Sequence, residues 1–330
     1  MLKKPKILVV GSLMMDLTAI TPKAPNEGET VIGTRFVSNP GGKGANQAVQ
    51  CARLGAEVTM VGQVGDDAFG PRMKGAVADA GVDVTHITVD PNESSGTALI
   101  TLEVSERGAL NRITVCPGSN FTLTVDDIAW LKDDIKNYDM VMMQFEMQMS
   151  VIEAVAQWAH DAGVPVMINP APAAPMSEKL LACSTYVSPN EHEAATLSGH
   201  AVDVSNGVNM DDVAKVAEIL RGQGVGNLII TLGENGSALV DDEGIHTTPC
   251  VKLPPQDTTA AGDSYVASFC TGISAGMTRD QAMAFASHAA GIAVSRLGAI
   301  PSLPTIEEVQ SLMAERGYTG FDLAELDALK

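Results

Sequence analysis

The apolar positions of this 330-residue chain follow two alternating patterns. Short continuous apolar runs, typical of strands buried on both faces, occupy residues 7–10, 58–61, 140–143, 164–168 and 228–232. Stretches with helical spacing occupy residues 150–162, 211–221, 261–275 and 279–296. Because strands interleave with helices, the pattern predicts an α/β fold with a mainly parallel central sheet flanked by helices.

Two regions break this alternation. Residues 17–40 and 95–115 are rich in Thr, Val, Ile and Gly and have strand character without intervening helices. They predict a small discontinuous β-sheet attached to a single domain that spans residues 1–330. The acidic residues at 318–330 predict a loosely packed tail.

Composition and charge narrow the class of protein. Hydrophobic residues make up 45% of the chain, which is typical of a globular protein with a sizeable core. The net charge of −19 argues against nucleic acids and anionic membranes as partners. The apolar run at 7–10 is broken by Gly11 and Ser12, so it predicts a buried strand rather than a signal peptide, and no run approaches a membrane span. Five scattered cysteines without C-x-x-C spacing predict reduced thiols in a cytoplasmic protein.

The segment Asp-Thr-Thr-Ala-Ala-Gly-Asp-Ser at 257–264 opens a predicted helix. N–H groups at a helix start are unpaired and the dipole is positive there, so the turn can hold an anion. The small side chains of Ala260, Ala261 and Gly262 would let a phosphate approach the backbone, with Asp263 beside it as a base for an attacking hydroxyl. The alternative is an ordinary turn in which Asp263 balances the helix dipole.

A glycine-rich segment, Asn-Pro-Gly-Gly-Lys-Gly-Ala-Asn-Gln-Ala, lies at 39–48 and leads into another helical pattern. Lys43 and Asn46 would face a polar ligand at the helix start, and the pair Gly41 and Gly42 would form a flexible joint. The segment is not a Walker A loop, because no Ser or Thr follows the lysine. A plain glycine-rich connection with a solvated lysine is the alternative.

Two acidic residues follow predicted strands. Asp16 lies just past the strand at 7–10, and Glu146 lies just past the strand at 140–143. In an open α/β sheet, ligands bind at the carboxyl ends of strands, and carboxylates accept hydrogen bonds from hydroxyl groups. A surface loop acid and a solvated strand end are the alternatives.

Together the two glycine-containing segments resemble the two signature regions of the ribokinase-like (pfkB-type) carbohydrate kinases. Further matching motifs lie in the family's order at 11–12, 28–30, 169–173, 189–193, 230–233 and 298–302. The Asn-Pro-Ala-Pro-Ala run at 169–173 is most similar to the ribokinase and deoxyribokinase branch. The resemblance implies an ATP-dependent kinase that phosphorylates the 5-hydroxyl of D-ribose or 2-deoxy-D-ribose, with Asp263 as general base. It also implies that the small β-sheet is a lid over the sugar and the contact of a homodimer.

The resemblance assigns the remaining site residues. Those implied to contact the sugar are Met14, Asp16, Gly42, Lys43, Asn46, Glu146 and Asp263. Those implied to contact ATP are Asn190, Thr231, Gly233, Ala260, Ala261, Gly262 and His288. Glu193 would hold Mg²⁺ through water, although Asn190 and Glu193 also fit a helix capping box. Those implied to surround an activating K⁺ are Asp257, Thr259, Val294, Leu297, Gly298 and Ser302.

Met14 departs from the ribokinase pattern, in which an asparagine usually stands two residues before the sugar-binding aspartate. An amide hydrogen-bonds sugar hydroxyls, whereas a thioether offers an apolar surface. The deoxyribokinases resemble this chain in having methionine there. The sequence therefore leaves ribose and 2-deoxyribose both open.

Two other functions remain open. A kinase of another small polyol, such as a nucleoside, fructose or a sugar phosphate, would use the same motifs. A phosphorylated substrate would call for basic residues in the lid, where Arg35, Arg107 and Arg112 are available. The non-enzymatic alternative is a sugar-sensing protein, against which the presence of Asp263 and Lys43 argues.

Overall fold

The computed structural model describes residues 1–105, 108–205 and 207–330. Within them, nine strands form a central sheet, and β12 alone runs antiparallel to its two neighbours. In spatial order the strands are β13 (Gly244–Thr248), β12 (Ser237–Asp241), β11 (Asn227–Thr231), β10 (Tyr186–Val187), β9 (Val166–Asn169), β8 (Met140–Gln144), β1 (Lys6–Val10), β4 (Glu57–Gly65) and β5 (Ile87–Asp90). The mainly parallel α/β sheet is thus confirmed.

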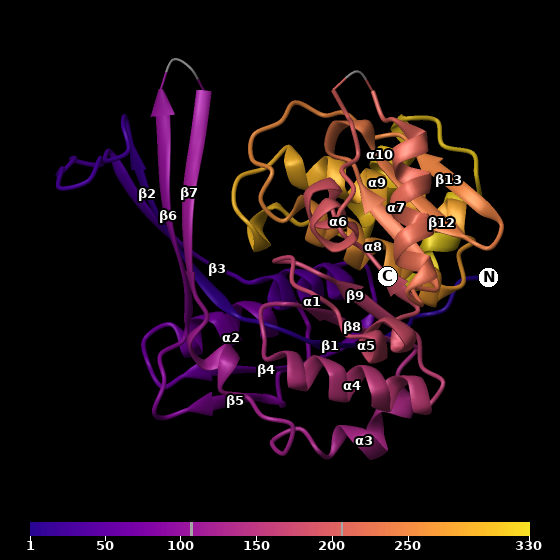
Figure 1. Cartoon of the computed structure of the whole chain (residues 1–330), viewed down its shortest axis with the longest axis horizontal. Helices are drawn as coiled ribbons and strands as arrows, with labels where there is room; N and C mark the ends of the chain where they lie inside the picture. Colours follow the sequence, from indigo (N-terminus) through magenta and orange to yellow (C-terminus); the bar gives the residue numbers. More distant parts are fainter. Residues whose placement is uncertain (106–107, 206) are drawn as a thin grey trace.

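Helices cover both faces of this sheet (Figure 1). The α-helices described are α1 (Lys43–Arg53), α2 (Gly70–Ala78), α3 (Leu131–Asp134), α4 (Met149–Asp161), α5 (Glu178–Cys183), α6 (Glu191–Ser198), α7 (Met210–Gly222), α8 (Ala261–Ala275), α9 (Arg279–Val294) and α10 (Ile306–Glu315). In β1, Ile7 and Val9 pack in the core beneath α1, α8 and α9, while Leu8 and Val10 pack in the core beneath α4. Burial on both faces explains why the strand reads as an unbroken apolar run.

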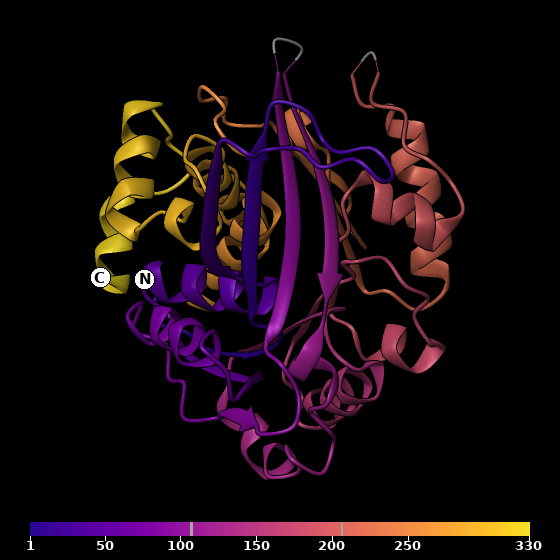
Figure 2. The ribbon, with the colours of Figure 1, turned by 90° about the vertical axis from the view of Figure 1, so that its left-hand side faces the viewer.

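A second, small sheet stands beside the central one, and Figure 2 looks onto it with the helical body behind. Its order is β3 (Arg35–Gly41), β2 (Met14–Thr21), β6 (Gly96–Ser105) and β7 (Gly108–Cys116). The small β-sheet is confirmed, and its strand β2 begins at Met14, three residues before the predicted region. Asp16 therefore lies inside a strand, where β-sheet alternation fixes the side of the sheet to which its carboxylate points.

The predicted loose tail is wrong. Residues Leu323–Leu329 form a 3₁₀ helix, and Leu326 and Leu329 are fully buried in the main core. Their apolar side chains outweigh the acidic character of the segment. Helix α9 also ends earlier than predicted, at Val294 rather than at residue 296.

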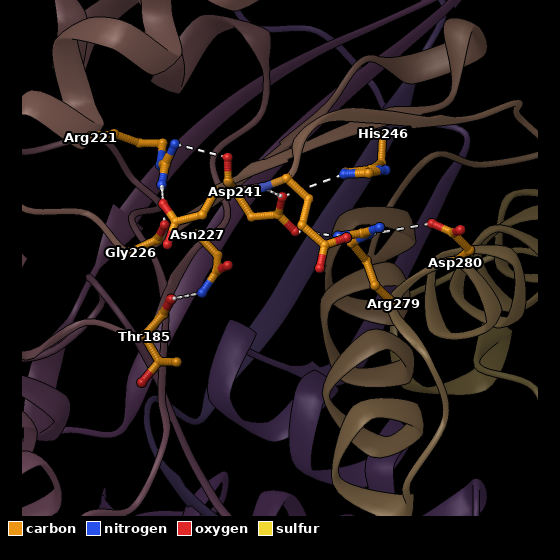
Figure 3. Close-up of polar contacts among 10 residues, drawn as sticks. Thr185, Arg221, Gly226, Asn227, Asp241, His246, Arg279 and Asp280 are labelled. Carbon is orange, nitrogen blue, oxygen red and sulfur yellow. Dashed lines mark hydrogen bonds and ion pairs between the residues drawn. The ribbon is translucent and has the colours of Figure 1, made fainter.

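The hairpin of β12 and β13 was not predicted, and two arginines anchor it (Figure 3). Arg221 of α7 donates to the carbonyl oxygen of Asp241 at 2.9 Å and pairs with Asp242. Arg279 of α9 donates to Asp241 Oδ2 at 2.5 Å. The hairpin is thus fixed to helices on both sides, so this polar cluster has a structural explanation.

Candidate active site

A cavity of about 1000 Å³ lies between the small sheet and the central body. Its volume is at the upper end for small-molecule sites, which suits a site for two substrates. The expected site residues that line it are Met14, Asp16, Gly42, Lys43, Asn46, Glu146, Glu193, Asp257, Thr259, Ala260, Asp263 and Leu297. Residues from β2, α1, the end of β8 and the start of α8 therefore meet in one place.

Close backbone packing explains the glycines at the start of α1. Gly42 has a φ of 95°, and a Cβ there would lie 2.7 Å from the Met14 nitrogen. A Cβ on Gly44 would lie 2.4 Å from the Ser12 nitrogen. Only glycine lets the start of α1 lie against the segment that joins β1 to β2. This close approach, more than flexibility, explains why the chain has glycines beside Lys43.

The start of α8 has the geometry of an anion site. Its first i→i−4 bond runs from Ser264 N to the carbonyl oxygen of Ala260 at 2.8 Å, so the N–H groups of Gly262 and Asp263 precede the helical ladder. Ala261 N instead donates to the Thr258 carbonyl oxygen at 3.2 Å. Ala260 has a left-handed φ of 60°, a conformation that costs a non-glycine residue roughly 1–2 kcal/mol. Such strain at a helix start is typical of a functional turn.

Glu146 and Lys43 form the polar floor of the cavity. Ser12 Oγ donates to Glu146 Oε2 at 2.5 Å, and Lys43 N donates to the same oxygen at 3.0 Å. Burial raises the pKa of Glu146, although Lys43 and Ser12 act in the opposite direction. Burial alone would lower the pKa of Lys43, but the carboxylates of Asp263, Glu146 and Glu193 together raise it. Lys43 therefore remains a cation among carboxylates.

The ionised form of Asp16 is unfavourable because its carboxylate is buried near other carboxylates. Burial raises its pKa from 3.8 to about 7, with the carboxylates of Glu146, Asp263 and Asp257 contributing to that rise. Between about pH 4 and pH 7 the native state therefore holds a proton at Asp16 that the unfolded chain has already released. Stability from this group falls as the pH rises through that window, and the cost is fully present above pH 7.

We expect Asp16→Asn to stabilise the ligand-free protein at pH 8, because the buried charge is removed. The gain should be on the order of 2 kcal/mol, since each unit of pKa shift corresponds to about 1.4 kcal/mol and water in the cavity reduces the cost. Thermal unfolding at pH 8 and pH 4 measures it: the gain should shrink at pH 4. The exposed Asp126, changed to Asn, is the matched control. An equal gain at both pH values would contradict the assignment.

Several expected residues do not line the cavity. At the nucleotide end these are Asn190, Thr231, Gly233, Ala261, Gly262 and His288, and around the potassium position they are Val294, Gly298 and Ser302. Asn190 accepts from Glu193 N and Glu193 accepts from Asn190 N, so the capping box is present and fixes Glu193 at the cavity wall. His288 Nδ1 lies 2.7 Å from the Ala284 carbonyl oxygen, and burial lowers its pKa.

The residues implied to hold metal ions can be checked against their surroundings. Asp257 Oδ1 accepts from Thr259 N at 2.9 Å, and its Oδ2 accepts from Gly298 N at 2.9 Å. This carboxylate therefore joins the two segments that would supply carbonyl oxygens to K⁺, so the arrangement fits. In the described residues no three His, Cys, Asp or Glu side chains form a metal cluster. Mg²⁺ bound through water and phosphate oxygens, with Glu193 nearby, needs no such cluster.

The sequence interpretation missed four polar residues behind the cavity. Ser12, Gln47, Gln144 and Asn169 are buried and hydrogen-bonded to site residues or to one another. Gln47 and Ser12 lie within quoted motifs, but their carboxylate partners, Asp263 and Glu146, are 216 and 134 residues away. No local pattern could have indicated those partners.

No helix in the described part of the chain is long and apolar enough to cross a membrane.

The chain is similar in sequence to a known family and to individual known proteins. The model of the pfkB family carbohydrate kinases matches residues 4–306. The chain is 35% identical over 308 residues to a ribokinase of Bacillus subtilis, covering 93% of this chain and 99% of the relative. It is 32% identical over 310 residues to a deoxyribokinase of Salmonella typhi, covering 93% and 98%.

A solved structure extends the likeness to three dimensions. The ribokinase of Arabidopsis thaliana, in complex with ribose and ATP, matches with a TM-score of 0.85 at 29% identity, over 94% of this chain and 99% of that one. Sequence and overall fold thus point to the same relatives, and the chain belongs to the pfkB family of carbohydrate kinases.

Proposed function

We propose that the protein is an ATP-dependent pentose kinase that phosphorylates the 5-hydroxyl of D-ribose or 2-deoxy-D-ribose. The observation that carries this proposal is the meeting of Asp263, at the start of α8, with Lys43, Asn46, Asp16 and Glu146 in one cavity. The relatives named ribokinase and deoxyribokinase, and the relative solved with ribose and ATP, support the same substrates.

In the proposed reaction Asp263 accepts the proton of the 5-hydroxyl. The sugar oxygen then bonds to the γ-phosphorus while the bond from that phosphorus to the ADP oxygen breaks. The N–H groups of Ala260, Gly262 and Asp263 stabilise charge on the transferring group. Asp16 and Glu146 accept hydrogen bonds from the other sugar hydroxyls.

The proposed cofactors are Mg²⁺ and K⁺. Glu193 would hold Mg²⁺ through water, and the ion would offset charge on the phosphates. The segments joined by Asp257 would hold K⁺ beside the start of α8. ATP would further contact Asn190, Thr231, Gly233 and His288. The small sheet would act as a lid that excludes water from the sugar.

The positions of the arginines in the small sheet argue against a phosphorylated sugar as the substrate. Arg112 pairs with Glu103 at 3.3 Å and stands, by strand alternation, on the side of β7 away from the cavity. Arg35 is exposed on β3 and does not line the cavity. Arg107 lies outside the described residues. Lys43 is the one basic residue among the described lining residues, so a sugar-bound phosphate would face mainly carboxylates.

We also propose a homodimer in the cytoplasm, joined through the small sheet. Exposed apolar residues of this sheet that do not line the cavity support this contact: Phe36, Leu99 and Val104. Light scattering in solution tests the dimer, and a monomeric mass at micromolar concentration would exclude it.

The test of the function is the initial rate of ADP formation from Mg-ATP with D-ribose, 2-deoxy-D-ribose, fructose or a nucleoside at matched concentrations. We expect turnover with a pentose, loss of turnover on chelation of Mg²⁺, and a lower rate when Na⁺ replaces K⁺. Sugar binding without any ADP formation would favour the sugar-sensing alternative instead.

A further inference from the structure

Side-chain amides hold both carboxylate oxygens of Asp263. Asn46 Nδ2 donates to Oδ2 at 2.9 Å, and Gln47 Nε2 donates to Oδ1 at 3.0 Å. Asn46 lines the cavity, whereas Gln47 is fully buried and does not line it. The two oxygens therefore differ: Oδ2 lies on the cavity side and Oδ1 is turned into the protein.

The orientation of the Gln47 amide is fixed by its own partners. Gln144 Nε2 donates to Gln47 Oε1 at 2.6 Å, and Gln47 Nε2 also donates to Asn169 Oδ1 at 3.1 Å. Asn169 Nδ2 in turn donates to the Ser188 carbonyl oxygen at 2.8 Å. If the amide were turned around, these hydrogen bonds would be lost and buried polar atoms would be left unpaired, at a cost in folding free energy. The Nε2 group must therefore face Asp263.

This arrangement ties Asp263 to the central sheet. Gln144 ends β8 and Asn169 ends β9, and both strands end at the edge where the cavity opens. Rotation of the Asp263 carboxylate would break the bond to Gln47 and leave one N–H of this buried amide unpaired. The carboxylate is thus held at one angle before any substrate binds.

We propose that Gln47 is a positioning residue for phosphoryl transfer: it fixes Oδ1 of Asp263 so that Oδ2 accepts the proton, and Gln144 acts through Gln47. The proposal rests on the kinase activity proposed above. Once the sugar is bound, Asn46 shares its amide with the substrate, and Gln47 keeps the base oriented.

Gln47→Met removes the donor and keeps a side chain of similar length. We expect kcat to fall about 10- to 100-fold, as misplaced catalytic groups do, with the sugar KM nearly unchanged because Asn46, Asp16 and Glu146 remain. The pH below which kcat falls should also rise, since the carboxylate loses a donor that favours its ionised form. The charged groups around it stay the same in the variant: Lys43, Asp16, Glu146, Glu193 and Asp257.

Gln50→Met is the matched control. Gln50 lies one turn further along α1, is fully buried, donates to the Pro304 carbonyl oxygen at 3.1 Å and accepts from Ser264 at 3.0 Å. This variant should lose stability as Gln47→Met does, while kcat and the pH profile stay unchanged. Gln47→Glu, of nearly identical size, provides a second variant if Gln47→Met fails to fold. The carboxyl group of this second variant would share a proton with Asp263 and would raise still further the pH below which kcat falls.

A double-mutant cycle tests the role of Gln144. Gln144→Met should lower kcat less than Gln47→Met, and the double variant should be no slower than Gln47→Met alone. A Gln47→Met enzyme with the wild-type kcat and pH profile would overturn the proposal. Absence of turnover in the wild-type protein would instead overturn the kinase activity itself, so the two failures are distinguishable.

Discussion

Asp263→Asn should lower kcat by about 10²–10⁴, the usual contribution of a general base, while ADP binding stays near the wild-type affinity. The variant keeps the size of the side chain, but an amide does not take up the proton of the sugar hydroxyl. Asp263 is 6% exposed and lines the cavity, so water cannot readily replace it as base. Initial rates of ADP formation and calorimetry with ADP measure the two quantities.

The hydrogen bonds around Asp263 show how the variant can fold. In the variant, the NH₂ group of the new asparagine would face another hydrogen-bond donor, which is either Asn46 Nδ2 or Gln47 Nε2. Asn46 can turn its amide, because its Oδ1 is buried without a partner in the described structure. Ser264→Ala is the control, since it removes a buried hydrogen bond to Gln50 from the same turn of α8 and leaves Asp263 in place. Turnover of Asp263→Asn within tenfold of the wild type would remove Asp263 from the role of base.

Met14→Asn should shift the ratio of kcat/KM for ribose to kcat/KM for 2-deoxyribose about 10- to 100-fold toward ribose. A hydroxyl held against a thioether loses its hydrogen bonds, at a cost of about 1–3 kcal/mol, and an amide restores them. Met14 lines the cavity, is 2% exposed, and pairs with Gly41 and Gly96 in the small sheet. Its position is therefore fixed by strands on both sides.

Met15→Leu is the matched control for this shift. Met15 is the next residue of β2, points to the opposite side of the strand and packs in the main core. A volume-conserving change there should leave the ratio of the two sugars unaltered. An unchanged ratio in Met14→Asn would mean that other groups of the cavity recognise the sugar's 2-position.

The amino-acid sequence by itself determines those helices and strands that have a characteristic local pattern of residues. A strand buried on both faces reads as a continuous apolar run, so β1, β4, β8, β9 and β11 were predictable. The helix α8 begins at Ala261 as predicted, because glycine and small residues precede its apolar spacing. The residue types at 41–46 and 260–263 also indicate a polar site, since helix starts and glycine turns bind anions in any fold.

The tertiary structure alone decides which of these residues meet. Asn46 and Asp263 are 217 positions apart, and only the order of strands in the sheet brings them within 2.9 Å. The same holds for Gln47 and Gln144, for Met14 facing the cavity, and for the burial of Leu326 and Leu329 beneath an acidic surface. Such contacts depend on the packing of distant segments, which no local pattern of residues encodes.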